Sequence, residues 1–433
     1  MDQADTTVTA RDRALDFCRV VAVVLVVFGH WLAAALTYRN GTFGRENALL
    51  EMPWTQWLTW IFQVVPVFFV VAGYASAVSW SRWQSTANTR RDTWFRHRLS
   101  RIAGATGVYV AVVLITVAVL GRLGVDRSAL AFGGWAVALH LWFLAVYLVV
   151  VALTPILVAA QRRWGLAVPA ALGAGVVAVD ALTIGLGVPH IGWLNYVLAW
   201  AAVYQLGIAW QGGLLRGRRP VALGVCAALL LILLVTLGPY PVSMIGVPGD
   251  AVQNTTPPSL ALLAFAAAQA GLLLTAVPLL NRALRSPRWR RPLELANQNV
   301  MALYLWHMVP VVVVTIVGYP SGLLPQPPLG SGDWWLARLL WLSVLALVTA
   351  VELAFLWWRR AWFAPALPVV EVRLPGRLAE PLFFTGAGAI AIALSAFAAR
   401  GFAPGGSFPV LTALLFAVGI ALMALTPRHA DRA

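Results

Sequence analysis

Long apolar stretches recur along the whole chain, and they restrict it to one kind of architecture. Each is roughly 17–25 residues long, the length of an α-helix that crosses the hydrocarbon core of a bilayer. Of the 433 residues, 61% are hydrophobic and 11% are charged, whereas roughly a quarter of a soluble domain is charged. The sequence therefore predicts an all-α fold, a polytopic membrane bundle of about 10–12 transmembrane helices. We place the spans near residues 18–36, 57–80, 102–120, 135–158, 166–187, 194–210, 221–238, 259–280, 300–318, 335–358, 381–399 and 408–425.

Arginine supplies every basic residue, since the 31 Lys and Arg positions contain no lysine, and the formal net charge is +15. In a soluble protein this charge would suggest binding to nucleic acid. Membrane proteins, however, concentrate arginine in their cytoplasmic loops. Most arginines of this chain fall in alternate loops, on the side of the N-terminus. We therefore expect a multi-pass protein of the cell membrane, with both termini in the cytoplasm and no nucleic-acid partner.

The chain divides into three predicted parts. Residues 1–16 form a polar cytoplasmic segment, residues 17–360 a transmembrane domain, and residues 361–433 a loop followed by an extra pair of transmembrane helices. The first span lacks a small-residue cleavage site, so we expect a retained anchor instead of a signal peptide. Cys18 and Cys226 have no further cysteine or histidine at the spacing of metal ligands. The sequence thus predicts neither a metal site nor a disulfide.

The first span carries ionisable residues in an otherwise apolar helix, “RALDFCRVVAVVLVVFGHW” (Arg13–Trp31). Arg19 and His30 are eleven residues apart, close to three full turns, so they share one helix face about 16 Å apart. Asp16, three residues before Arg19, can orient its guanidinium. Two interpretations of His30 are open, a residue of a substrate pathway and an interhelical hydrogen-bond partner. Arg19 can also be a cytoplasmic anchor of the helix.

A second cluster lies just before the third span, in “FRHRLSRI” (Phe95–Ile102). Arg98 and Arg101 are three residues apart and are neighbours on a helix, with Arg96 nearby. Guanidinium groups bind phosphate with two parallel hydrogen bonds, which favours a phosphate-bearing ligand. The alternative is contact with anionic lipid headgroups.

Further ionisable residues lie within apolar stretches. His307 lies about a turn and a half into the ninth span, with Tyr304 one turn earlier. His140 lies near the outer end of the fourth span, and we favour a structural role for it. Glu352 and Asp180 also fall inside spans, where each can pair with an arginine or with a backbone group.

Five stretches together resemble the multi-spanning membrane acyltransferase-3 family. They are the Arg-x10-His stretch of the first span, “VFFVVAGYASA” (Val67–Ala77), “RHRLSRI” (Arg96–Ile102), “HLWFLAVYL” (His140–Leu148) and “LYLWH” (Leu303–His307). They occur in the order of the family, and the resemblance covers roughly residues 10–360.

The resemblance implies an activity and a site. Family members transfer an acyl group, commonly acetyl, from cytoplasmic acyl-CoA to a hydroxyl of a sugar, lipid or other metabolite. It implies that His30 is catalytic and that Arg19, Arg98 and Arg101 serve donor binding or site structure. The chain also departs from the family. It has “ANQNVMAL” (Ala296–Leu303) before His307, where the family often has Gly and Ser, and about twelve spans instead of ten. No hydrolase-like domain follows.

The residues themselves agree with acyl transfer to an alcohol. The reaction needs a base that is neutral near physiological pH, which is the property of histidine. We see no G-x-S-x-G stretch, and so we expect direct transfer to the acceptor instead of an acyl-enzyme. A secondary transporter or exporter of a glycan or metabolite is the alternative, because twelve spans are common among transporters. A lipid-linked glycosyltransferase is a third class, which would use acidic residues of the first outer loop. Glu46 and Glu51 lie there, but they are five residues apart and no Asp pair accompanies them, which disfavours this class.

Overall fold

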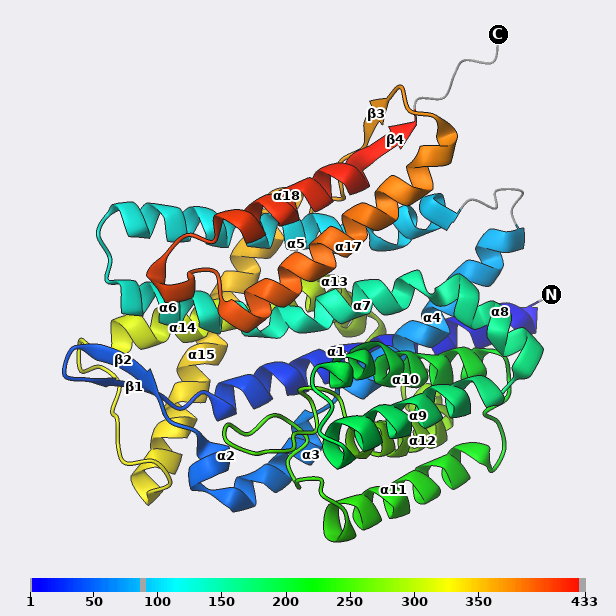
Figure 1. Ribbon diagram of the computed structural model, residues 1–433, viewed down its shortest axis with the longest axis horizontal. Helices are drawn as coiled ribbons and strands as arrows, with labels where there is room; N and C mark the ends of the chain where they lie inside the picture. Colours follow the sequence, from blue (N-terminus) through cyan, green and yellow to red (C-terminus); the bar gives the residue numbers. More distant parts are fainter. Residues whose placement is uncertain (1, 86–90, 428–433) are drawn as a thin grey trace. The chain divides into compact units, whose positions relative to one another are not determined.

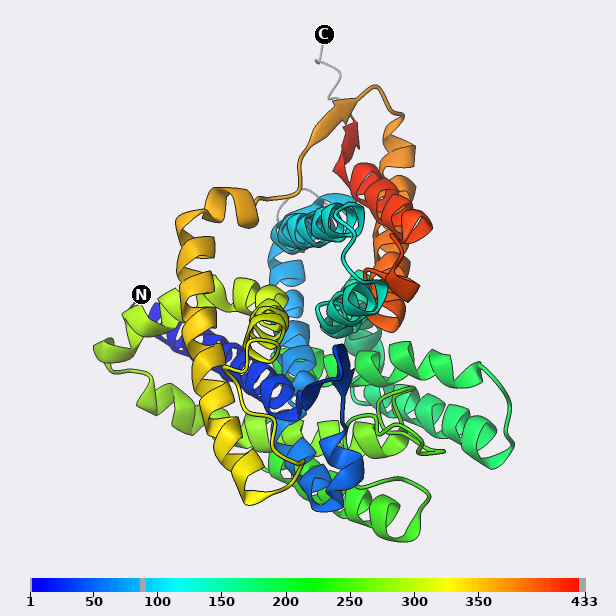
Figure 2. The same cartoon turned by 90° about the vertical axis from the view of Figure 1, so that its left-hand side faces the viewer.

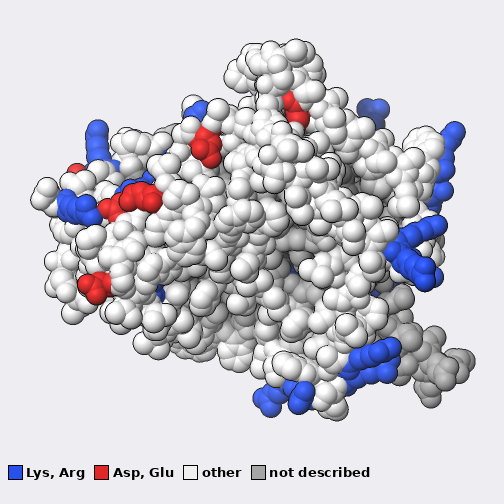
Figure 3. Space-filling view, turned by 90° about the horizontal axis from the view of Figure 1, so that it is seen from below, with Lys and Arg blue, Asp and Glu red and all other residues white. Residues whose placement is uncertain are grey.

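The computed structural model describes residues 2–85 and 91–427 and, within its first helix, the side chains from residue 13 onwards. Most of the described chain is helical, with two small two-stranded sheets (Figure 1). Within these residues, 10 helices are long and apolar enough to cross a membrane, or up to 11 if one bent pair counts as a single span. The predicted polytopic helical membrane fold is therefore confirmed. The face drawn in Figure 3 is mostly uncharged, and its charged side chains gather in patches.

The chain separates into two compact units, each built from several segments of the sequence. Unit 1 consists of Met1–Ala33, Asn47–Ser85 and Val150–Val300. Its helices are α1 (Asp2–Ala33), α2 (Ala48–Glu51), η1 (Pro53–Leu58), α3 (Thr59–Phe62), α4 (Val65–Ser85), the end of α7 (Trp142–Ala152), α8 (Thr154–Trp164), α9 (Ala167–Asp180), the π-helical turn η3 (Ala181–Gly185), η4 (Ile191–Leu194), α10 (Asn195–Gln211), α11 (Arg219–Leu237), α12 (Leu260–Ala283), η5 (Pro287–Trp289) and most of α13 (Arg290–Trp306).

Two glycines set the closest helix contact of unit 1, between α4 and α10. A Cβ atom added at Gly73 would lie 2.0 Å from the carbonyl oxygen of Tyr204. One added at Gly207 would lie 2.0 Å from the carbonyl oxygen of Val70. The two backbones can approach only because neither glycine has a side chain, which is a common way for helices to associate within a membrane.

Buried polar groups hold the loop between α11 and α12 against the rest of unit 1. Asp180, the last residue of α9, accepts hydrogen bonds from the Asn195 amide at 2.8 Å, the Tyr240 hydroxyl at 2.8 Å and the Leu260 N–H at 2.7 Å. Burial and the Asp180 carboxylate raise the pKa of Tyr240, which lies in the loop. The sequence left open whether Asp180 pairs with an arginine or with the backbone. In the structure it binds a backbone N–H and two neutral side chains.

Unit 2 consists of Ala34–Glu46, Thr86–Val149 and Met301–Ala433. Its elements are β1 (Leu36–Arg39), β2 (Thr42–Arg45), α5 (Arg91–Arg122), α6 (Arg127–Ala136), η2 (Leu139–Leu141), the start of α7, the end of α13, α14 (Met308–Gly318), α15 (Gly332–Trp358), α16 (Arg360–Phe363), β3 (Val370–Val372), α17 (Gly376–Arg400), η6 (Pro404–Gly406), α18 (Val410–Ala424) and β4 (Leu425–Pro427).

The C-terminal helices pack against α5. In Figure 1, α17 and α18 run side by side along it. Arg96 of α5 donates hydrogen bonds to the carbonyl oxygens of Met423 and Leu425 and lies 5.0 Å from the ring centroid of Phe383. Figure 2 shows the chain leaving α15 through α16 and reaching β3, which pairs in parallel with β4. The predicted span 408–425 is α18, whose 15 residues are fewer than the roughly 20 of a typical span.

A β-hairpin follows the end of α1. Its turn residues, Asn40 and Gly41, have φ values of 52° and 79°, the left-handed conformation that an Asn-Gly hairpin turn adopts. β1 and β2 pair in antiparallel register, and the Phe43 ring stacks on Phe132 of α6 with centroids 5.9 Å apart. The hairpin therefore gives a fixed shape to the start of the segment between the first two predicted spans, which was expected to be only a loop.

The predicted span 300–318 is broken at His307. α13 ends at Trp306, α14 begins at Met308, and the two helices are bent by 52°. Pro310 explains the break, because it has no N–H to donate to the carbonyl of Trp306 and its ring crowds the preceding turn. His307 therefore sits at a bend of the predicted ninth span.

Candidate active site

One face of α1 carries the three residues predicted for catalysis. The helix is unbroken from Asp2 to Ala33, so Arg19 and His30 lie about 16 Å apart along it. Asp16 and Arg19 form an ion pair at 3.5 Å, and each side chain is 34% exposed. A pair this exposed adds little stability. Its effect is to fix the direction of the Arg19 guanidinium.

Arg19 has a second partner that the sequence analysis did not identify. Its Nη1 donates a hydrogen bond to Oδ1 of Asn297, on α13, at 3.0 Å. Arg13, further back on α1, donates to the carbonyl oxygen of Leu284 at 3.2 Å. Asn297 lies in the stretch noted only as a departure from the family. Because 278 positions separate it from Arg19, no local spacing could have connected the two residues.

His30 lies in the last turn of α1, where this helix meets α3. The contact is tight, since a Cβ added at the neighbouring Gly29 would lie 2.8 Å from Cβ of Phe62. The His30 residue is partly buried. The position of His30 on α1 is thus set beside this contact between α1 and α3.

The predicted donor-binding arginines lie on α5. Arg98 is partly buried and Arg101 is exposed. The segment after α16 fastens this part of α5, because the Leu367 N–H donates to both the carbonyl oxygen of Ser100 at 2.9 Å and its hydroxyl at 3.0 Å. Arg98 and Arg101 belong to unit 2 and Arg19 to unit 1. That all three bind one donor molecule remains a prediction.

Two histidines and a tyrosine predicted separately meet inside unit 2. The ring centroid of His140 lies 5.0 Å from that of His307 and 5.3 Å from that of Tyr304. The Tyr304 hydroxyl donates to the His140 carbonyl oxygen at 2.6 Å, and Nδ1 of His307 lies 2.8 Å from the Tyr304 carbonyl oxygen. His140 is 2% exposed and His307 is fully buried. The cluster forms where the α13–α14 bend meets η2, so spacing along the chain could not indicate it.

Glu352 lies on α15, also in unit 2. One of its carboxylate oxygens, Oε2, is buried without a hydrogen-bond partner among the residues that the structure describes. A buried carboxylate oxygen in this position requires an explanation, and so Glu352 remains a candidate. In the described parts of the chain, no group of three or more His, Cys, Asp or Glu side chains could hold a metal ion.

Comparison with known proteins connects this arrangement to a family. No curated protein and no solved structure matches the chain. A family model described as an acyltransferase domain matches residues 12–357. The match contains Asp16, Arg19, His30, Arg98, Arg101, His140, Tyr304, His307 and Glu352, and it ends before α17 and α18. Because it covers most of the chain, the protein is a membrane acyltransferase that belongs to the acyltransferase-3 family.

Proposed function

We propose that this acyltransferase moves an acyl group, acetyl in the simplest case, from cytoplasmic acyl-CoA to a hydroxyl of a carbohydrate, lipid or exported metabolite. The observation that carries the proposal is the geometry of α1. An arginine oriented by Asp16 and Asn297 lies near the middle of the helix, and a histidine follows about 16 Å further along the same face, in the last turn. The extended pantetheine arm of CoA can span a distance of this order.

In the proposed reaction, His30 acts as the general base. Its neutral imidazole accepts the proton of the acceptor hydroxyl while that oxygen attacks the thioester carbonyl carbon. The new C–O ester bond forms and the C–S bond breaks. The imidazolium then returns its proton to the departing thiolate, which leaves as free CoA. The proton balance closes without a metal ion or an acyl-enzyme.

Arg98 and Arg101 are proposed to bind the phosphates of the donor. They are neighbours on α5, whose position is fixed by the segment after α16 and by the Arg96 contacts to the C-terminal residues. Guanidinium groups form strong, charge-assisted hydrogen bonds with phosphate. Arg19, in unit 1, would align the part of the site that α1 carries.

The first test is release of CoA by purified protein. The protein in lipid nanodiscs is mixed with acetyl-CoA and a cell-envelope extract as acceptor, and free thiol is measured over time. We expect CoA to appear faster than with discs that contain no protein. A transporter would release none, and an absence of release would contradict the proposal.

The second test identifies the product in cells. Mass spectrometry compares envelope glycans, lipids and secreted metabolites of a deletion strain with those of its parent. We expect the loss of an ester-linked acyl group, restored by the parent gene but not by a His30→Gln variant. An unchanged acylation profile would contradict the proposed function.

A further inference from the structure

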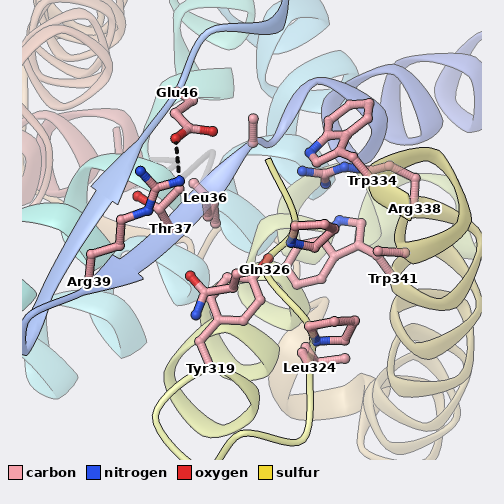
Figure 4. Close-up of a pocket in the computed structure, with 14 residues that line it drawn as sticks. Leu36, Thr37, Arg39, Glu46, Tyr319, Leu324, Gln326, Trp334, Arg338 and Trp341 are labelled. Carbon is pink, nitrogen blue, oxygen red and sulfur yellow. Dashed lines mark hydrogen bonds and ion pairs between the residues drawn. The ribbon is translucent and has the colours of Figure 1, made fainter. Parts of the chain in front are cut away.

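A small pocket in unit 2 lies between the β1–β2 hairpin, the segment after α14 and the start of α15 (Figure 4). Its cavity measures about 30 Å³, whereas a single water needs roughly 10–15 Å³. The space therefore accepts a small polar group but not a whole sugar ring. None of the residues predicted for catalysis or donor binding lines it.

A buried guanidinium forms one wall of this pocket. Arg338, on α15, is 5% exposed. Its charged carbon lies 4.5 Å from the ring centroid of Trp334 and 5.7 Å from that of Trp341, and Figure 4 shows the group beside both indoles. Nη1 donates a hydrogen bond to the carbonyl oxygen of Ala34 at 2.8 Å. A guanidinium has five N–H groups that can donate a hydrogen bond. Within the described chain, Arg338 uses one of them in this contact.

The carboxylate in the lining of the pocket already has a hydrogen-bond partner. Glu46 accepts a hydrogen bond from Arg39 at 2.9 Å across the hairpin, as the dashed line in Figure 4 indicates. The pocket lining thus contains two arginines and one carboxylate, which leaves one positive charge in excess. A buried charge is costly unless it is paired, and so the pocket favours an anion.

The geometry also indicates which kind of anion fits. A guanidinium and a carboxylate are both planar and form two parallel hydrogen bonds, and a cavity of about 30 Å³ has room for one small group of this kind. Tyr319 supplies a further donor, since burial raises the pKa of its hydroxyl and keeps it protonated at neutral pH. Its ring stacks on Trp341 with centroids 5.9 Å apart.

We propose that this pocket binds a carboxylate on the acceptor, and hence that the acceptor is an acidic, hydroxyl-bearing molecule such as a uronic-acid sugar. The inference rests on the proposed function, because it names the class of acceptor. The first pocket residue, Ala35, follows His30 by only five positions. Arg338 would hold the acid group while the rest of the acceptor, with its reactive hydroxyl, remains outside the cavity.

Binding without any acyl donor tests this inference separately from acyl transfer. Protein in phosphatidylcholine nanodiscs is titrated calorimetrically with D-glucuronate, D-glucose 6-phosphate and D-glucose. We expect D-glucuronate to bind, with the phosphate sugar weaker and glucose at least about 10-fold weaker, as for the loss of a charge-assisted hydrogen bond. Equal binding of all three, or none by D-glucuronate, would overturn the inference. Loss of D-glucuronate binding when phosphatidylglycerol is added would assign the pocket to lipid headgroups instead.

Variants separate the pocket from general effects on folding. Arg338→Gln should weaken D-glucuronate binding on the order of 10-fold to 100-fold. Ala337→Leu fills the cavity while leaving the guanidinium and its Ala34 contact in place, and it should weaken binding to a similar extent. Arg122→Gln, which removes an exposed arginine elsewhere in unit 2, should bind as the parent does. Parent-like binding by both pocket variants would refute the assignment, whereas a lack of CoA release would contradict the proposed function and leave carboxylate binding by the pocket standing.

Discussion

Arg19 is held from two directions, by Asp16 on its own helix and by Asn297 on α13. Neither contact involves a fully buried charge, so we attribute orientation to them and not stability. His30 differs, because it lies in the last turn of α1 beside the tight approach of Gly29 to Phe62. At the scale of single residues, α1 therefore combines an oriented cation with a histidine in apolar surroundings.

His30→Gln should lower the rate of acyl transfer by roughly 10²–10⁴-fold, the usual effect of losing a general base. Glutamine can keep a hydrogen bond but cannot accept a proton near neutral pH. Steady-state CoA release measures the effect, and binding of acetyl-CoA should stay as in the parent. His190→Gln, an exposed histidine, is the matched control and should leave the rate unchanged. Near-parent turnover by His30→Gln would leave a structural role for the residue.

Arg98→Ala should weaken acyl-CoA binding by about 1.5–3 kcal/mol, the range for a hydrogen bond to a charged group. Arg101→Ala should cost less, because Arg101 is exposed and water screens its charge. Equilibrium binding of a non-hydrolysable acetyl-CoA analogue measures both. Arg216→Ala, another exposed arginine, should bind as the parent does. If all three variants bind equally, Arg98 and Arg101 serve as anchors of the helix.

Helix contacts, not single side chains, position the elements that carry the candidate site. α4 and α10 meet through two glycines, α1 meets α3 at another, and α5 is fastened by the segment after α16. α13 and α14 are set at 52° to each other, which brings His307 to His140. At the scale of helices, it is therefore a break in a helix that brings the two buried histidines together.

Gly207→Ala should destabilise unit 1 by about 1–3 kcal/mol, the usual cost of overpacking a core. The added methyl group would meet the Val70 carbonyl oxygen at 2.0 Å, so α4 and α10 must move apart. Thermal unfolding in detergent, followed by tryptophan fluorescence, measures the loss. Gly388→Ala provides the control, because a Cβ there meets no atom within 4 Å. Equal midpoints for the two variants would contradict the importance of this contact.

The whole molecule consists of two units that each draw on several distant segments of the chain. The predicted donor arginines, Arg98 and Arg101, belong to unit 2, and the predicted base, His30, belongs to unit 1. The C-terminal helices lie beyond the family match but pack on α5 within unit 2. They therefore support the helix that carries Arg98 and Arg101.

The orientation of the chain in the membrane can be tested by cysteine labelling. With Cys226 replaced by alanine, the remaining native Cys18 is buried and should not react. Thr42→Cys on the hairpin should then react with a membrane-impermeant maleimide in intact cells, whereas Arg218→Cys should react only after permeabilisation. Both positions are exposed. The reverse labelling pattern would mean that the termini lie outside.

Some properties of this protein follow from local sequence alone, because hydropathy and helix geometry depend on residues a few positions apart. Apolar stretches of span length predicted the polytopic helical fold, and the eleven-residue spacing of Arg19 and His30 predicted their common face. The family resemblance, carried by five short stretches, was confirmed by a match over residues 12–357. The hairpin also has a local signal, the Asn40–Gly41 pair, but the hairpin was not among the structures predicted from the sequence.

Only the tertiary structure decided which distant residues meet. The partners of Arg19 and Arg338 lie 278 and 304 positions away, and His140 meets His307 only because the helix breaks before Pro310. Asp180 binds a backbone N–H, a tyrosine and an amide, and not an arginine, because these groups lie beside it in the folded chain. Hydrogen bonds and cavities depend on which residues pack together in three dimensions. The residues that neighbour a position along the chain do not show which distant residues it will contact.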